Sequence, residues 1–313
     1  MNTEHRRARL WVAILLSFFG GAAMASQAMV NGELGARLHN GFVAATISNT
    51  SGIVVLTLIA LASARVRAGW KGIADGIRTK RIPWLFTLAG VTGGFFVTSQ
   101  GLFVNVLGVA SFTVAFIAGN SLGGVLMDMW GVGPAGRRHP SPKRLIGAGL
   151  GIVAVAIAGT GRFGEPQSLW LLAIPMVIGF GVSWQQAANG RLSVEAHTPM
   201  TATYLNFLTG TAIMLVFTFS AAPFTGLPVQ YPTDWWLYLG GPLGVFFVSI
   251  TSMMLRVVGV LVFTLVATLG QLAAALTFDI LWPGRAEALA VFLGVLVMAG
   301  AVVVATWRKP LSR

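Results

Sequence analysis

Residues 27–34 read QAMVNGEL, and residues 185–192 read QQAANGRL. The Gln, Asn, Gly and Leu of the two stretches stand in the same order and at the same spacing, with Gln27 and Gln185 separated by 158 positions. Each stretch closes an apolar run of about twenty residues, the length of one membrane-spanning helix. A polar motif that closes two such runs indicates an internal duplication.

The composition requires lipid to cover much of the chain. Of 313 residues, 55% are hydrophobic and only 10% are charged, whereas a soluble domain has about 25% charged residues. The apolar runs lack the alternation of outer-membrane barrel strands, which favours helices. We therefore predict an all-α integral membrane protein with ten transmembrane helices, over residues 10–31, 41–64, 83–105, 108–130, 144–161, 169–190, 199–221, 235–258, 260–282 and 287–307.

The duplication extends over the whole chain. The second and seventh spans keep the offset of 158, as in Gly52 and Gly210, and the offset becomes 151 in the third and eighth spans and in the fourth and ninth. The change falls where the long basic loop after the second span meets a shorter counterpart at 222–234. We expect two five-helix repeats, at residues 1–164 and 165–313.

An odd number of helices per repeat makes the second copy enter the membrane from the opposite side. Inverted repeats are the architecture of many secondary transporters, whose substrate sites lie near the midplane between the halves. The fold class therefore favours transport, although a fold alone does not fix a function.

The basic residues give this layout an orientation. The net charge is +12, and with the N-terminus in the cytoplasm all but three of the 21 Lys and Arg residues fall on the cytoplasmic side. The exceptions are Arg37, Arg162 and Arg285. This bias follows the positive-inside rule. Because no nucleic-acid signature accompanies the charge, we expect a lipid bilayer as the partner and no nucleic acid.

Amide side chains line one face of the first and sixth helices. Gln27 and Asn31 are four residues apart, as are Gln185 and Asn189, so each pair shares a helix face. An amide in hydrocarbon is costly without a partner, which predicts that these groups line a polar cavity. Interhelical hydrogen bonds are the alternative, and the Asn-Gly pairs could also mark helix C-termini.

Further polar residues occur in the second, fourth, seventh and ninth spans. Ser48 and Asn206 occupy matched positions, and so do Asn120 and Gln271, which directly follow Gly119 and Gly270. A glycine beside a buried amide lets a neighbouring backbone approach closely, which serves tight packing and a binding site equally well. We expect all four residues to line the substrate cavity.

Asp128 and Asp279 are candidates for ion or proton coupling, because a membrane carboxylate is by default a functional residue. Both lie about two residues from the predicted ends of their helices, however. An interfacial or helix-end carboxylate is therefore the favoured interpretation.

The residue types that are missing limit which reactions and substrates we expect. The chain has no cysteine, and no Lys, Arg or His falls at the predicted midplane. It carries no phosphate-binding loop signature, no metal-ligand cluster and no nucleophile–base arrangement. We therefore expect no enzyme activity, metal or cofactor. The substrate should be a small neutral, zwitterionic or weakly cationic polar molecule, since anionic substrates need cationic partners.

The paired Gln-x-x-x-Asn-Gly-x-Leu motif, the Gly-Asn or Gly-Gln pair with a later Asp, and five helices per unit resemble the YdcZ-type branch of the drug/metabolite transporter superfamily, in a fused two-repeat form. The resemblance implies a bacterial cytoplasmic (inner) membrane location and export of small molecules. It also implies that helices one to four and six to nine surround a cavity, with helices five and ten to the side. Asn120 departs from the Gln expected there, and the first helix lacks the embedded Glu of proton-coupled small multidrug exporters.

Together these patterns predict a secondary transporter that exports its substrate by alternating access, as a monomer or a homodimer. A flippase for a lipid-linked intermediate and a non-transporting membrane subunit are the alternatives.

Overall fold

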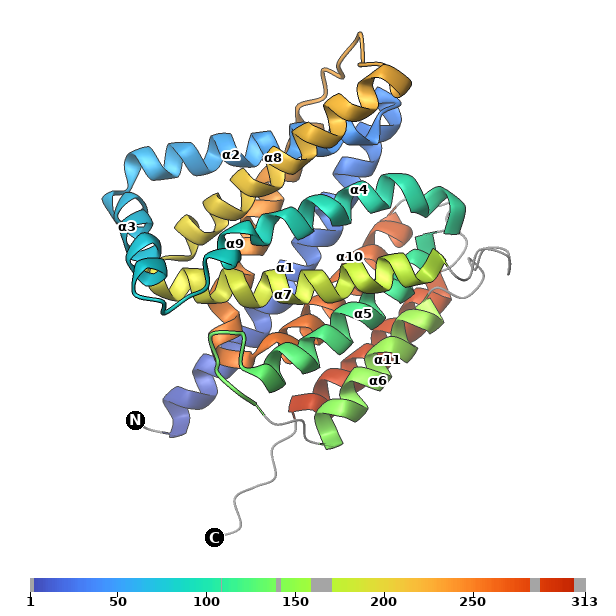
Figure 1. Ribbon diagram of the computed structural model, residues 1–313. Helices are drawn as coiled ribbons and strands as arrows, with labels where there is room; N and C mark the ends of the chain where they lie inside the picture. The colour runs from blue at the N-terminus through green and yellow to red at the C-terminus, as the bar shows by residue number, and fades with distance from the viewer. Residues whose placement is uncertain (1–2, 108, 139–141, 159–170, 282–287, 307–313) are drawn as a thin grey trace.

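The computed structural model describes residues 3–107, 109–138, 142–158, 171–281 and 288–306, and all regular structure in these ranges is helical (Figure 1). A helix lies over each of the ten predicted spans. The elements are α1 (Thr3–Leu38), α2 (Gly41–Ala62), α3 (Ala64–Arg78), η1 (Trp84–Leu88), α4 (Ala89–Leu107), α5 (Val109–Trp130), α6 (Pro142–Ala158), α7 (Ala173–Glu195), α8 (Pro199–Thr225), η3 (Trp235–Tyr238), α9 (Gly240–Val258), α10 (Val260–Leu281) and α11 (Ala288–Thr306).

Four of the described helical segments are long and apolar enough to cross a membrane, namely Arg9–Leu38, Gly41–Ala62, Pro199–Thr225 and Trp235–Val258. Their outward-facing side chains include exposed Trp11, Phe19, Leu58 and Phe219. Large apolar side chains that point outward along such long helices suit lipid as their solvent.

The segment expected to be a long basic loop contains α3 instead. Val66, Gly69, Ile73 and Gly76 recur at helical spacing and are buried, whereas the rest of the helix is mostly exposed. Too few apolar residues occur here for a membrane span, so apolar run length does not detect this short amphipathic helix.

The Asn-Gly pairs do not end their helices. α1 continues past Asn31 to Leu38, and α7 continues past Asn189 to Glu195. A histidine with positive φ follows each helix: His39, with a φ of 49°, comes directly after α1, and His197, with a φ of 55°, comes two residues after α7.

The residue after each histidine is the N-cap of the next helix. The side chain of Asn40 accepts a hydrogen bond from Val43 N at 3.1 Å, and that of Thr198 accepts one from Met200 N at 3.3 Å. These N-caps satisfy amides that a helix start otherwise leaves unpaired. The α1–α2 and α7–α8 corners are therefore tight and built alike.

The helix contacts come in matched pairs. α1 packs against α9 and α10, whereas α7 packs against α4 and α5. α2 contacts α8 and α9, and α8 contacts α2 and α4. α6 and α11 lie side by side at one edge of the bundle (Figure 1), where they also contact α5 and α10.

Glycine permits the closest of these crossings. A methyl group at Gly179 in α7 would lie 2.9 Å from Asn120 N and closer still to the carbonyl oxygen of Phe116. A methyl group at Gly21 in α1 would meet the carbonyl group of Ala267 in α10 in the same way. The backbones of α7 and α5, and of α1 and α10, are thus in direct contact, a packing mode typical of membrane helices.

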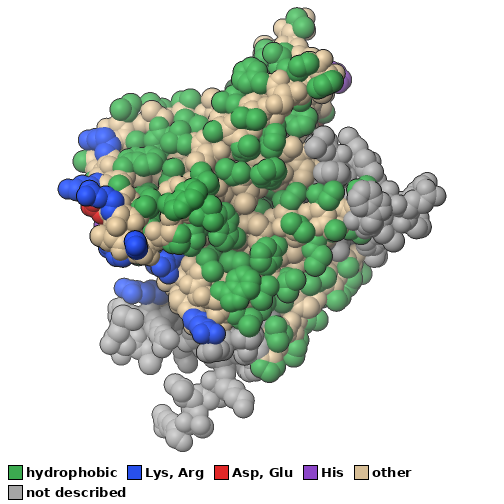
Figure 2. All heavy atoms as spheres, in the orientation of Figure 1, with side chains coloured by type: hydrophobic (Ala, Val, Ile, Leu, Met, Phe, Trp, Pro, Cys, Tyr) green, Lys and Arg blue, Asp and Glu red, His purple; other side chains and the backbone are tan. Residues whose placement is uncertain are grey.

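Charge and apolar surface are segregated. Figure 2 shows Lys and Arg side chains gathered at one end of the molecule, around α3 and the loop after α5, while hydrophobic side chains cover the flanks of the bundle. The exposed basic residues at this end include Arg65, Arg67, Lys71, Arg78 and Arg137. The surface therefore has the layout of a bundle that is embedded across a membrane.

We expect Gly179→Ala to lower the free energy of unfolding by about 1–3 kcal/mol, the usual cost of overpacking a tight site. The added methyl group would clash with the α5 backbone, which cannot move aside as a flexible side chain could. Thermal unfolding in detergent measures the effect. Gly149→Ala in α6 is the matched control, because nothing lies within 4 Å of a methyl group there, and alanine should be neutral or stabilising by up to about 1 kcal/mol. Equal stability of the two variants would contradict the close crossing.

Candidate functional site

Three predicted site residues surround the start of α9. Gln27 and Asn31 project from successive turns of α1, and Ser48 projects from α2. The side chain of Gln27 lies over Gly244, and those of Asn31 and Ser48 lie over Gly240, close enough that a methyl group at either glycine would clash with them. We call Gln27, Asn31 and Ser48 the α9-side cluster.

The residues at matched positions of the other half, Gln185, Asn189 and Asn206, form the α4-side cluster. Gln185 Nε2 donates to Asn206 Oδ1 at 3.4 Å, and Gln185 Oε1 accepts from the hydroxyl of Thr92 at 3.0 Å. A methyl group at Gly93 would lie 2.9 Å from Gln185 Nε2. Gln185 therefore faces Gly93 of α4 much as Gln27 faces Gly244 of α9.

Both clusters hold buried polar atoms without partners. Within the described part of the chain, Asn31 Oδ1, Ser48 Oγ, Asn189 Oδ1 and Asn206 Nδ2 make no hydrogen bond to protein. Each such atom costs about 1–3 kcal/mol if nothing pairs with it. Native structures contain few unpaired buried groups, and those that occur call for a physical reason.

Asn120 and Gln271 are engaged in contacts between helices. The hydroxyl of Ser183 in α7 donates to Asn120 Oδ1 at 2.6 Å and also to the Asn120 carbonyl oxygen. Gln271 Nε2 donates to the sulfur of Met24 in α1 at 2.9 Å. These bonds tie α5 to α7 and α10 to α1, beside the glycine crossings.

Asp128 caps a helix of the other half. It is only 2% exposed, and its carboxylate accepts hydrogen bonds from Val260 N at 3.0 Å and Leu261 N at 3.3 Å. These are the first amides of α10, where the helix dipole favours a negative charge. The helix-end interpretation thus describes the contacts of Asp128 well. Asp279 lies in the last turn of α10, and its side chain is outside the described residues.

Arg138 complements this cap at the end of the preceding helix. Its guanidinium donates to the carbonyl oxygens of Val258 at 2.6 Å and Val257 at 3.2 Å, the last residues of α9. Gly259, with a φ of 84°, joins α9 to α10 between the two charged groups. The negative charge of Asp128 at the start of α10 and the positive charge of Arg138 at the end of α9 each complement the dipole of the helix that they cap.

Ion pairs join the two halves at both ends of the bundle. Arg37, at the end of α1, pairs with Glu33 on its own helix and with Asp234 just before η3. Glu195, at the end of α7, pairs with Arg81 just before η1 at 3.1 Å. Arg37 and Glu195 occupy matched positions at the offset of 158, so the two pairs are built alike with their charges exchanged.

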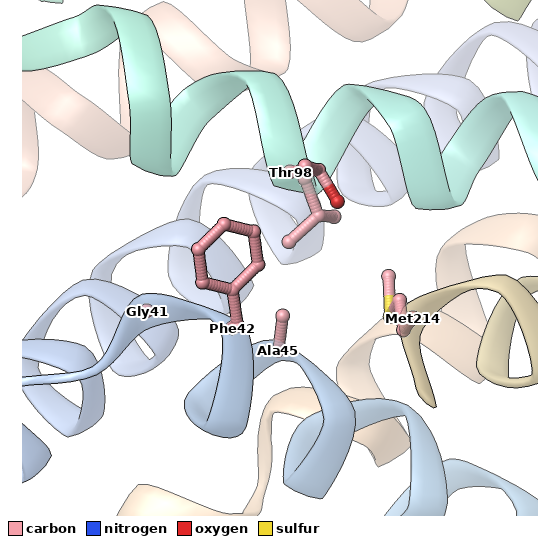
Figure 3. A pocket seen from close by; sticks show the side chains of 6 residues that line it. Gly41, Phe42, Ala45, Thr98 and Met214 are labelled. Carbon is pink, nitrogen blue, oxygen red and sulfur yellow. The ribbon is translucent and has the colours of Figure 1, made fainter. Parts of the chain in front are cut away.

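A cavity of about 60 Å3 opens elsewhere, between the start of α2, α4 and α8. Figure 3 shows Phe42, Thr98 and Met214 around it. Its lining is mostly apolar, and none of the predicted site residues belongs to it. Ligand pockets usually have about 300 Å3 or more, so this cavity is not the polar site.

Sequence reasoning missed the partners of the amides. Thr92 and Ser183 were not predicted as site residues, although both hydrogen-bond to predicted ones. The pairing of Thr203 with Ser249 at 3.0 Å between α8 and α9 was missed as well. A single hydroxyl residue in an apolar span carries no periodic signal. The offset of 158 relates Arg37 to Glu195, but a search for identical residues at matched positions overlooks them because their charges are opposite.

Comparison with known proteins identifies one family. The family model described as "Putative inner membrane exporter, YdcZ" matches residues 12–157 and 170–304, one segment in each half of the chain. No curated protein matches. Among solved structures, one described only as "Crystal structure of protein" aligns with a TM-score of 0.62 and 16% identity over 94% of this chain and 97% of its own. At that identity the likeness concerns the fold alone.

We expect Asp128→Ala to lower the free energy of unfolding by about 0.5–2 kcal/mol, the usual effect of losing an N-cap. Asp128→Asn keeps a carbonyl oxygen that can accept from Val260 N and should retain more of the stability. Thermal unfolding midpoints in detergent decide between them. An alanine variant as stable as the parent protein would contradict the capping role.

Proposed function

Because the chain belongs to the YdcZ family of inner membrane exporters, we propose that it exports a small neutral, zwitterionic or weakly cationic polar molecule by alternating access. The family is one of multi-pass transporters of the inner membrane rather than enzymes. The observation that carries the proposal is the set of buried, unpaired polar atoms in the two amide clusters. A flippase is not favoured by membership of an exporter family.

The proposed architecture is a pair of inverted halves, residues 1–164 and 165–313, with the N-terminus in the cytoplasm. Support comes from contacts that repeat at matched positions. Gly119 faces the carbonyl oxygen of Met176, and Gly270 faces that of Phe18. The two glycines are 151 positions apart, and their partners Phe18 and Met176 are 158 positions apart, as the repeat predicts. The gathering of Lys and Arg at one end (Figure 2) supports the orientation.

The substrate chemistry follows from the clusters. Their side chains are amides and hydroxyls, which both donate and accept hydrogen bonds. Asn206 Nδ2 offers a free donor, and Asn31 Oδ1 and Ser48 Oγ offer free acceptors. No charged side chain belongs to either cluster. A solute with both donors and acceptors would satisfy these atoms, and its binding would remove the cost of leaving them unpaired.

Alternating access requires that the two ends of the bundle open in turn. We propose that the Arg37–Asp234 and Arg81–Glu195 pairs act as latches at the two ends. The Arg37–Asp234 pair joins the end of α1 to the segment that leads into α9. The Arg81–Glu195 pair joins the end of α7 to the segment that leads into α4. Opening one end would separate one pair and leave the other in place.

We expect Asp234→Asn and Glu195→Gln to favour opening at opposite ends. Because the chain has no cysteine, spin labels can be placed at single introduced cysteines. Asp234→Asn should lengthen the Ala36–Thr233 distance, and Glu195→Gln should lengthen the Val194–Thr79 distance, each without lengthening the other. All four labelling positions are exposed. Parallel changes at both ends in both variants would contradict the latch proposal.

We expect Gln27→Leu with Gln185→Leu to abolish binding and transport while the protein remains folded. Ligands that bind the native state raise its thermal unfolding midpoint, so a panel of amino acids, polyols and amines would identify a ligand. Efflux of that ligand from proteoliposomes would then be compared between variants.

The matched control is Gln230→Leu, the same change at an exposed position in the segment before η3. It should retain both stabilisation by the ligand and efflux. A folded double variant that transports as well as this control would contradict the assignment of the glutamines.

A further inference from the structure

We propose that the exposed face of α3 binds the headgroups of anionic phospholipids. α3 lies across the end of the bundle where the Lys and Arg side chains gather (Figures 1 and 2), and it runs at a steep angle to α4 and α7. A helix in this position lies in the membrane interface rather than across the membrane.

Three of the four cations of α3 form a stripe, and the fourth, Arg65, lies on a different side of the helix. Arg67, Lys71 and Arg78 are spaced by four and seven residues, and all are exposed. On a helical projection this stripe is opposite the middle of the buried face that Val66, Gly69, Ile73 and Gly76 form. Topological sorting requires only that basic residues lie on the cytoplasmic side. It does not require that they share one face of an amphipathic helix.

The buried face of α3 is docked against the other half of the protein, which fixes the direction of the stripe. The hydroxyl of Thr201 in α8 donates to the carbonyl oxygen of Val66 at 2.8 Å. Methyl groups at Gly69 or Gly72 would clash with Thr201 or with the Glu195 carbonyl oxygen. The helix therefore presents its cations outward as part of a rigid surface.

Several neighbouring arginines are occupied by the protein itself. Arg67 donates to the last carbonyl groups of α2, Arg65 donates to the His197 carbonyl, and Arg81 pairs with Glu195. Lys71, Arg78 and Lys80 are exposed, and their side chains have no hydrogen-bond or ion-pair partner among the described residues. Asp75 is half-buried and forms no ion pair with Lys71 in that same part of the chain.

Lys71 and Arg78 on the stripe, together with Lys80 two residues after the end of α3, match the charge of an anionic lipid surface. Each Lys or Arg near such a surface strengthens binding about fivefold at low ionic strength. The attraction falls as salt is added, because the Debye length shortens to about 10 Å at 0.1 M. Zwitterionic lipids offer no net charge and should show no such preference.

The test uses a fluorescent label at Ala74→Cys, an exposed position on the stripe between Lys71 and Arg78. The cysteine-free chain allows single-site labelling. The labelled protein is reconstituted with phosphatidylglycerol or phosphatidylcholine carrying brominated acyl chains, which quench a nearby fluorophore. Relative quenching in mixed bilayers then measures the preference at this site.

We expect brominated phosphatidylglycerol to be preferred over brominated phosphatidylcholine by at least about fivefold at low salt. The preference should fall towards one in the Lys71→Gln, Arg78→Gln, Lys80→Gln variant, and also at high salt. A label at Ser220→Cys, exposed near the far end of α8, should show no preference in either background.

A charge-matched control removes Arg6, Arg7 and Arg9 at the start of α1 by substitution with Gln. It should leave unchanged the preference that the label on α3 reports. No preference in the parent protein would overturn the proposal. A preference that survives the triple substitution of Lys71, Arg78 and Lys80 would also overturn it. So would a preference that is lost equally in the α1 control, because that result would indicate diffuse surface charge instead of a site.

Discussion

The direct contact of helix backbones at glycine is the constraint on which the rest of the structure depends. α1 meets α10 where Gly21 faces Ala267, and α7 meets α5 where Gly179 faces Phe116. At such crossings two helices approach until the backbone of one lies against that of the other. Helices in lipid depend on this packing to associate, because no hydrophobic driving force acts between them there. Each contact joins a helix of one proposed half to a helix of the other. The halves therefore interlock, and neither could rearrange without moving these crossings as units.

The position of the amide clusters follows from this interlocking. Gln27 lies less than two turns beyond Gly21 on α1, and Gln185 lies at the same distance beyond Gly179 on α7. Once the crossings fix the helices, these amides must point at α9 and α4, where glycine again leaves room for them. Ser183 and Asn120 tie the α5–α7 crossing with a hydrogen bond. The same contacts thus provide rigidity and set polar groups in the interior, a combination that suits the proposed transport between two halves.

Sequence patterns predicted much of this arrangement, for identifiable reasons. Apolar runs locate long helices because each must match the thickness of lipid. The resemblance to the YdcZ-type family, read from motifs at matched positions, agrees with the family model that matches residues 12–157 and 170–304. α3 was missed because a short amphipathic helix has no long apolar run. The cap that Asp128 provides to α10 depends on a contact across 132 residues, which no local pattern reveals. The binding role of the amides stays a prediction, since their unpaired atoms show an opportunity for hydrogen bonding but not its occupant.

The two ends of the bundle are not equivalent, and this bears on the order of events in export. The Arg37–Asp234 latch stands beside an irregular segment before η3, whereas the Arg81–Glu195 latch stands beside α3, which adds backbone contacts to Glu195 and a hydrogen bond from Thr201. In the proposed orientation, with the N-terminus in the cytoplasm, α3 is on the side from which an exporter must load. In the proposed opening of that side, Glu195 separates from Arg81, whose backbone amide is hydrogen-bonded to Gly76 of α3. Because Arg81 is held to α3 in this way, separating the pair would also draw α3 away from the Glu195 backbone and from Thr201. The proposed opening at this end therefore has to break helix packing as well as an ion pair.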